Sequence, residues 1–305
     1  MFVSHLGEIA ALLTAIFWTV TSMSFEAAGK RIGSLQVNLI RLYIAFGIYS
    51  IYLWVVRGLP FPVDATAEAW IWLSLSGLVG FAIGDLLLFQ AFVVVGARVS
   101  MLIMAMVPPV TALSGWLILG ETLNYQHILG MILTVTGISM VIVGRDAAVS
   151  GSKKRKKLKL SYPVGGLLLA FGGAVGQAVG LVLSKFGMKD YDAFAASQIR
   201  VLAGIVGFTM IFFFMRRWNR VKTGLKNKKG MMFTTIGSVF GPFLGVSFSL
   251  LAVQHTEAGV AATIMSIVPI LLIPPAVLFF KEKITIREVI GSLVAVAGVA
   301  LLFMV

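Results

Sequence analysis

The strongest constraint on this chain is an internal duplication. The motif Ile103-Met104-x-x-Val107-Pro108 occurs again 161 residues later as Ile264-Met265-x-x-Val268-Pro269. A repeat of this length predicts two similar structural units, each containing a helix that proline distorts. The same offset relates further glycines: Gly80, Gly84, Gly130 and Gly137 correspond to Gly241, Gly245, Gly291 and Gly298.

The composition places both units in a membrane. Hydrophobic residues make up 59% of the chain and charged residues only 12%, whereas a soluble domain has about 25% charged residues. A helix that crosses a bilayer needs about 20 mostly apolar residues. We therefore expect an all-α membrane protein with ten transmembrane helices, at 6–26, 34–56, 69–93, 97–119, 124–143, 163–184, 194–215, 230–253, 258–280 and 286–304.

The basic residues predict how these helices are oriented. Of the 25 lysines and arginines, 20 lie in segments that follow odd-numbered helices, three lie in other loops and two lie inside helices. Basic loops of multi-pass proteins face the cytoplasm. We therefore expect basic cytoplasmic loops and both termini outside, in the inner or plasma membrane. The net charge of +13 then reflects these loops and does not indicate a nucleic-acid partner.

Ten helices divide into two units of five, and because five is odd the units cross the membrane in opposite directions. We expect the first repeat at 1–144, a basic cytoplasmic linker at 145–162 and the second repeat at 163–305. The opening helices align at an offset of 159, which relates Ile40-Arg41 to Ile199-Arg200. Such inverted-topology repeats are typical of secondary transporters, which build a substrate site where the repeats meet.

A stretch of the first half carries a family resemblance. The run Val107-Pro-Pro-x-Thr-Ala-Leu-x-Gly-Trp-x-x-x-Gly-Glu121-x-Leu resembles the EamA domain of the drug/metabolite transporter superfamily. The resemblance covers nearly the whole chain. It implies a ten-helix carrier that exports or exchanges small organic metabolites through a central cavity. Further matching positions are Trp18, Arg41, Gly96, Ala97, Gly130 and Gly137 in the first half, and Arg200, Pro269, Glu282, Gly291 and Gly298 in the second.

Asp85 is the expected centre of the transport chemistry. A carboxylate inside the hydrocarbon layer is costly and normally faces a bundle interior or a watery cavity. We expect it to bind substrate or to couple transport to protons; the structural alternative is a fixed ion pair with Arg41 or Arg98. The repeat provides no second acid, because position 246 is valine.

Arg41 and Arg200 lie about two turns inside their helices, one near each membrane face. An arginine so near a helix end can reach the interface, so a structural or gating role is favoured over substrate contact. Glu26 is expected as a solvated loop charge that could also gate with Lys30.

Prolines and neighbouring side chains predict the cavity wall. Pro108 and Pro269 break the helical hydrogen-bond ladder, and such breaks in a membrane line cavities. Met104 and Met265 lie one turn earlier, as pocket or core residues. Trp18 and Gln177 align at the offset of 159 and should contact substrate from opposite sides. Glycines four residues apart, including Gly176 and Gly180, predict close helix packing or sliding.

Other classes of function have less support. The three histidines lie far apart, no helix carries an acidic pair, and there is no cysteine or Walker loop. We expect no catalytic residues, no metal site and no cofactor, although a membrane-embedded enzyme or a channel-like facilitator remains the alternative. The expected partners are a small-molecule substrate, such as an amino acid, and the lipid bilayer. A homodimer is left open.

Overall fold

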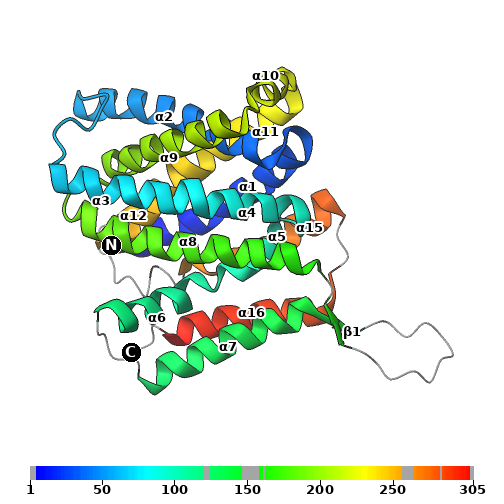
Figure 1. The fold of residues 1–305 in the computed structure, drawn as a ribbon. Helices are drawn as coiled ribbons and strands as arrows, with labels where there is room; N and C mark the ends of the chain where they lie inside the picture. Colours follow the sequence, from blue (N-terminus) through cyan, green and yellow to red (C-terminus); the bar gives the residue numbers. More distant parts are fainter. Residues whose placement is uncertain are drawn as a thin grey trace.

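The computed structural model describes residues 5–119, 124–145, 158–160, 162–255, 261, 264–281 and 284–302. The first half contains α1 (Leu6–Ile32), α2 (Ser34–Arg57), α3 (Ala67–Gly77), a π-helical segment (Leu78–Gly84), α4 (Asp85–Val94), α5 (Ala97–Met104), α6 (Val107–Leu119) and α7 (Tyr125–Ile142) (Figure 1). The second contains α8 (Val164–Met188), α9 (Ala193–Met215), α10 (Trp218–Lys226), α11 (Lys228–Ser238), a π-helical segment (Val239–Gly245), α12 (Val246–His255), α14 (Val268–Leu271), α15 (Ile273–Phe280) and α16 (Ile286–Leu302).

Seven described helices are long and apolar enough to cross a membrane, counting α3 to α4 and α11 to α12 each as one continuous helix. Two shorter apolar helices run over Ala97–Leu113 and Val268–Leu278. Large apolar side chains such as Ile51, Val55 and Ile71 are exposed on the outer surface, as expected where a helix bundle faces lipid. The chain is thus a multi-pass helical protein, and the count of ten spans stays a prediction.

The expected linker begins with a small β-hairpin. Strand β1 (Val143–Arg145) pairs antiparallel with β2 (Leu158–Leu160), with Gly144 opposite Lys159. The lysine-rich residues 146–157 between the strands lie outside the described residues.

The two halves are related by matching helix pairs. Helix α1 runs toward the end of the molecule that carries the hairpin, whereas α8 starts at the hairpin and runs back (Figure 1). The equivalent first helices of the halves are therefore antiparallel, as expected of inverted repeats. Each packs along the third helix of the other half: α8 lies against α3 and α4, and α1 lies against α11 and α12.

The two resulting contacts, which we call seams, differ in character. In the glycine seam, between α8 and α3–α4, a Cβ atom on Gly176 would lie 2.6 Å from the Cα of Gly84. In the aromatic seam, between α1 and α11–α12, a Cβ on Gly237 would instead meet the ring of Phe25, and one on Gly245 would meet Trp18. The glycine spacing that predicted close packing thus brings two backbones together in one seam and a backbone against side chains in the other.

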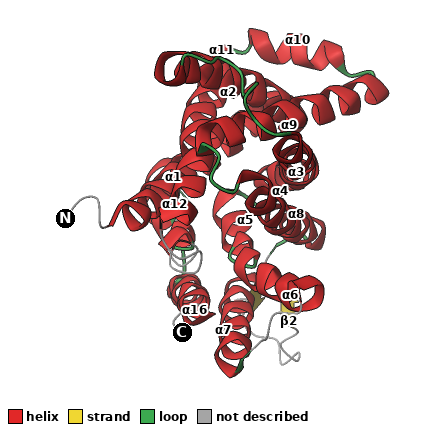
Figure 2. Ribbon diagram, turned by 90° about the vertical axis from the view of Figure 1, so that its left-hand side faces the viewer, coloured by secondary structure: helices red, strands yellow, loops and turns green. Residues whose placement is uncertain are grey.

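The remaining repeated glycines hold α7 against α16. A Cβ on Gly137 would contact the carbonyl of Gly291, and one on Gly298 would lie 2.8 Å from the carbonyl of Gly130. These two helices lie side by side and are set apart from α2 and α9 (Figure 2).

The duplicated proline motif interrupts its helix in the same way in both halves. Helix α5 ends at Met104, a turn covers Ala105 and Met106, and α6 begins at Val107. In the second half the turn covers Ser266 and Ile267, and α14 begins at Val268. The Pro108 ring would clash with the carbonyl four residues earlier, that of Met104, so the helix ends there.

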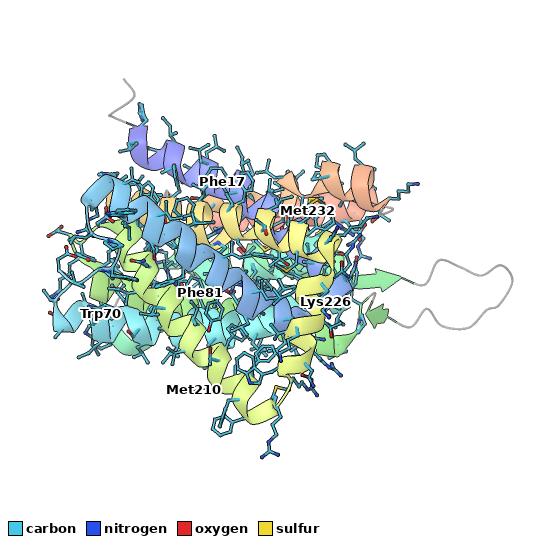
Figure 3. The ribbon with its side chains drawn as sticks, turned by 90° about the horizontal axis from the view of Figure 1, so that it is seen from above. Phe17, Trp70, Phe81, Met210, Lys226 and Met232 are labelled. Carbon is cyan, nitrogen blue, oxygen red and sulfur yellow. The ribbon has the colours of Figure 1, made fainter. Side chains whose placement is uncertain are left out.

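Basic residues lie at the end of the molecule that carries the hairpin. Trp70 lies near one end, Phe81 in the middle and Lys226 near the end that carries the hairpin (Figure 3). Lys30 and Arg31 belong to the same end, because the adjoining Ile32 packs against Gly224 of α10.

Candidate functional site

One cavity of about 190 Å³ lies between the halves, with walls from both repeats. Its wall includes the repeated methionines and prolines of each half and three of the charged residues singled out from the sequence. Its lining includes all nine predicted site residues: Trp18, Arg41, Asp85, Met104, Pro108, Gln177, Arg200, Met265 and Pro269. Their placement around one space is a structural finding, and their roles in binding or gating stay predictions.

Asp85 is the first residue of α4 and follows the π-helical segment directly. Its side chain forms a buried ion pair with Arg41 and accepts a 2.7 Å hydrogen bond from Nε2 of Gln177. Asn38 completes the arrangement: its Nδ2 donates to the backbone carbonyl of Asp85 at 3.1 Å, and its Oδ1 accepts from Nε of Arg41 at 3.1 Å. Three helices, α2, α4 and α8, are thus joined by polar contacts.

Of the two cations considered as structural partners of Asp85, the structure pairs it with Arg41. Arg98 instead lies 3.3 Å from Oε1 of Glu288, which also accepts a 3.1 Å hydrogen bond from the Tyr162 hydroxyl. Arg98 and Glu288 therefore join α5 to α16, away from Asp85.

The side chains of the two repeated arginines turn inward and do not reach the molecular surface. Arg41 and Arg200 are only 3% and 4% exposed, and both line the cavity. Their guanidinium groups lie over aromatic rings instead of reaching the surface: Arg41 lies 4.5 Å from the ring centre of Phe89, and Arg200 lies 4.9 Å from that of Phe81. Aromatic faces attract cations, and this attraction favours an inward orientation that helix position alone does not reveal.

The two arginines differ in their partners. Arg41 has Asp85 as counter-charge, whereas in the described part of the chain no hydrogen bond or ion pair engages the guanidinium of Arg200. Its Nε is buried without a hydrogen-bond partner among those residues. The repeat explains the difference, because the position equivalent to Asp85 is Val246, which also lines the cavity.

Around these charges the wall is mostly apolar. Phe25, Phe89, Met101 and Met104 come from the first half, and Met265 and Val268 from the second. Gln177 points its amide at Asp85, and Trp18 lies at the equivalent position of the other seam. Cavities that bind small molecules are usually apolar with a few polar groups that fix orientation, and this lining has that composition.

Glu26 does not behave as the expected solvated loop charge. It is 2% exposed, pairs with Lys30, and accepts a 2.6 Å hydrogen bond from the backbone N–H of Ala97, the first residue of α5. A carboxylate at a helix N-terminus satisfies a free donor and interacts favourably with the helix dipole. This role depends on a neighbour 71 residues away, which explains why the local sequence did not indicate it.

Sequence reasoning missed Pro242 of the cavity wall and the two hydroxyl groups bound near it. The hydroxyl of Tyr49 donates to the carbonyl of Pro242 at 2.5 Å and lies 2.7 Å from the Ser247 hydroxyl. Pro242 lies inside the second π-helical segment and lines the cavity. The only sequence signal for the two π-helical segments is their repeated glycine pairs. Glu121 and Glu282, which support the family resemblance, lie outside the described residues.

Two similar helical halves that enclose one partly charged cavity are typical of multi-pass membrane transporters. Comparison with protein families supports this class twice along the chain. The model of the EamA-like transporter family matches residues 5–143 and again residues 164–304. The chain therefore belongs to the EamA-like transporter family, and the resemblance noted from its motifs is confirmed.

A curated relative and a solved structure are similar to the chain. The uncharacterized transporter YvbV of Bacillus subtilis (strain 168) is 25% identical over 194 residues, which cover 64% of this chain and 59% of that protein. The chain thus matches about three fifths of that relative's length. One crystal structure superimposes with a TM-score of 0.60 at 15% identity, over 97% of this chain and 95% of the other; at that identity the likeness shows the fold alone.

Proposed function

We propose that this protein is a secondary active transporter that exports or exchanges small organic metabolites, such as amino acids, by alternating access. The observation that carries the proposal is the cavity itself. It lies between two antiparallel halves, and each half contributes a broken helix and an arginine to its wall. Inverted repeats around a shared site can rock against one another and open that site to each side in turn.

The size of the cavity favours small solutes over drug-sized ones. Its volume of about 190 Å³ is below the roughly 300–1,000 Å³ of pockets that hold drug-sized ligands. We place the hairpin end, with Lys30, Arg31 and Lys226, in the cytoplasm of an inner or plasma membrane, because basic loops favour that side.

Asp85 is our candidate for coupling transport to protons. Its carboxylate is held by Arg41 of α2 and Gln177 of α8, so a proton on Asp85 would weaken its contacts with both helices at once. Asp85→Asn should abolish pH-driven transport. Because this variant leaves the buried Arg41 without its counter-charge, we also expect it to lose about 3–5 kcal/mol of stability, so transport is compared on protein that unfolding measurements show to be folded. The hydrogen bond from Arg41 to Asn38 remains in the variant. Unchanged pH dependence in this variant would reduce Asp85 to a fixed structural partner.

The transporter proposal is tested in two stages. Metabolite profiling of cells that overproduce the protein should identify a solute whose distribution changes. That solute should then show counterflow in proteoliposomes, because a carrier is accelerated by solute on the opposite side. Flux without such acceleration would favour the channel-like alternative, and chemical conversion of the solute would favour a membrane-embedded enzyme.

A further inference from the structure

We infer that the transported solute is an organic monoanion, a carboxylate with an apolar and preferably aromatic body, whose carboxylate binds Arg200. This inference rests on the proposed function, a carrier of small organic metabolites. Within that function it replaces the zwitterionic amino acids given as an example with carboxylates that carry no ammonium group. Its starting point is the charge of the cavity. Three lining residues are charged, Arg41, Asp85 and Arg200, so the lining carries a net charge of +1.

The contacts of the three charged side chains show that the excess positive charge lies on Arg200. Arg41 and Asp85 neutralise each other, and Asp85 is further occupied by Gln177. Arg200 is 4% exposed and its Nε has no hydrogen-bond partner among the described residues. The charge of Asp85 acts on Arg200 electrostatically, but no salt bridge joins the two in that part of the chain.

A buried cation without a counter-charge is costly. A bound anion would remove that cost, and the donors of a guanidinium match a carboxylate with two parallel hydrogen bonds. A cationic solute would add a second excess charge. A zwitterion would place its ammonium group near Arg200 or over the apolar wall, since Asp85 is already occupied.

The rest of the wall indicates the body of the solute. Phe81 lies against Arg200, and Phe25, Phe89, Met104 and Met265 line the same space. Aromatic rings pair favourably with a bound ring, and methionine side chains adapt to irregular apolar shapes. A carboxylate at Arg200 would therefore leave a ring or branched chain among these residues.

Three probes of similar size separate the charge classes at neutral pH: 3-phenylpropionate is an anion, L-phenylalanine a zwitterion and 2-phenylethylamine a cation. Calorimetric titration of the purified wild-type protein should give at least about tenfold tighter binding of 3-phenylpropionate than of the other two, which corresponds to about 1.4 kcal/mol. Equal binding of the three, tighter binding of the zwitterion or the cation, or no binding of the anion would overturn the inference. This ranking needs no variant to fold.

Variants then locate the carboxylate. Arg200→Gln should lose the tenfold preference for the anion, and Arg200→Lys should keep a preference because it keeps the charge. Val246→Asp should also abolish the preference for the anion, because the new acid gives the second repeat the counter-charge that Asp85 provides in the first. The uncharged control Val246→Asn should keep that preference. Lys189→Gln, a surface change outside the cavity, should bind like the wild type. Full anion preference in both Arg200→Gln and Val246→Asp would overturn the assignment to Arg200.

Counterflow keeps this inference separate from the proposed function. Counterflow of a neutral or cationic metabolite alone would overturn the anion assignment and leave the transporter intact. Binding of 3-phenylpropionate with no counterflow of any solute would support the anion site and overturn the transport proposal.

Discussion

The two repeats place an arginine at equivalent positions of one cavity, yet among the described residues only the first repeat supplies an acid that pairs with it. Arg41 is held by Asp85, and Arg200 has Val246 at the corresponding place. The duplication thus fixes where the two arginines lie. On our inference, a single difference between the repeats, Asp85 against Val246, decides which arginine is left for a ligand. The difference between the two arginines therefore arises from the side chains around them, while the helices of the two halves keep equivalent positions.

The two seams likewise share equivalent positions but differ in their side chains. In the glycine seam, Ser76 donates a 2.7 Å hydrogen bond to the carbonyl of Gly180; in the aromatic seam, Thr21 donates at 2.6 Å to the carbonyl of Gly237. The repeat offsets make Ser76 equivalent to Gly237, and Gly180 equivalent to Thr21. Both seams therefore contain one hydroxyl–carbonyl bond between the same two positions, with donor and acceptor exchanged.

The largest effect on stability is expected from a substitution that breaks the ion pair between Arg41 and Asp85. Arg41→Gln leaves Asp85 without its counter-charge, and removal of one partner of a buried ion pair costs about 3–5 kcal/mol. Arg200→Gln removes a charge that has no ion-pair partner in the described residues, so it should leave stability unchanged or raise it. Thermal unfolding of the purified variants in detergent compares the two, and equal losses would contradict the difference between the repeats.

The seams should respond differently to an added methyl group. Gly176→Ala places a Cβ against the backbone of Gly84, where main chain must move, and such overpacking costs about 1–3 kcal/mol. In the matched variant Gly237→Ala the three atoms nearest to the added Cβ all belong to the ring of Phe25, a side chain that lines the cavity.

We therefore expect Gly176→Ala to lower the unfolding temperature and Gly237→Ala to weaken transport with a smaller loss of stability. Measuring unfolding and counterflow on both variants tests this contrast. A larger stability loss for Gly237→Ala would show that the aromatic seam is the more rigid of the two.

The two hydroxyl–carbonyl hydrogen bonds of the seams should contribute similarly to the free energy of unfolding. Ser76→Ala and Thr21→Val each remove a donor to a buried carbonyl, and a single hydrogen bond contributes about 1 kcal/mol net. Ser76 also lies 2.7 Å from the hydroxyl of Ser184, so its loss should be slightly greater. Unfolding measurements that give opposite signs for the two variants would refute the equivalence of these bonds.

The smallest effect on stability is expected at a partly exposed ion pair, which serves as a reference for the buried pair of Arg41 and Asp85. Arg57 and Asp64 lie 2.6 Å apart near the chain turn after α2, and exposed pairs contribute about 0–1 kcal/mol. Arg57→Gln should therefore cost at most about 1 kcal/mol at neutral pH.

The pH dependence of that pair has a defined sign. Partial burial raises the pKa of Asp64, but hydrogen bonds from Tyr191 and Arg57 outweigh it and leave the pKa below its usual value. A carboxyl with a lowered pKa stabilises the fold above its unfolded-state pKa, and this contribution is lost as the pH falls through the folded-state value. The difference in unfolding free energy between Arg57→Gln and the wild type should thus shrink in acid. A difference that grows in acid would contradict a lowered pKa of Asp64.

The sequence located the broken helices and the side chains of this site better than it predicted which side chains contact one another. The duplicated Met104–Pro108 and Met265–Pro269 motifs located both broken helices, because proline acts on its own helix. Local rules failed where a contact joins distant segments. The inward turn of Arg41 depends on Asp85, 44 residues away, and the burial of Glu26 depends on the start of α5. Such pairings follow from helix packing, which apolar periodicity leaves undetermined.

The most direct test of the account asks whether solute passes through the cavity between the repeats. The chain contains no cysteine, so single thiols can be introduced at Met104→Cys and Met265→Cys, with Lys189→Cys as a surface control. We predict that a bulky thiol reagent stops counterflow of the metabolite identified by profiling in both cavity variants, that this metabolite slows their labelling, and that the control keeps full activity. Complete labelling of both cavity positions with undiminished counterflow would contradict the account.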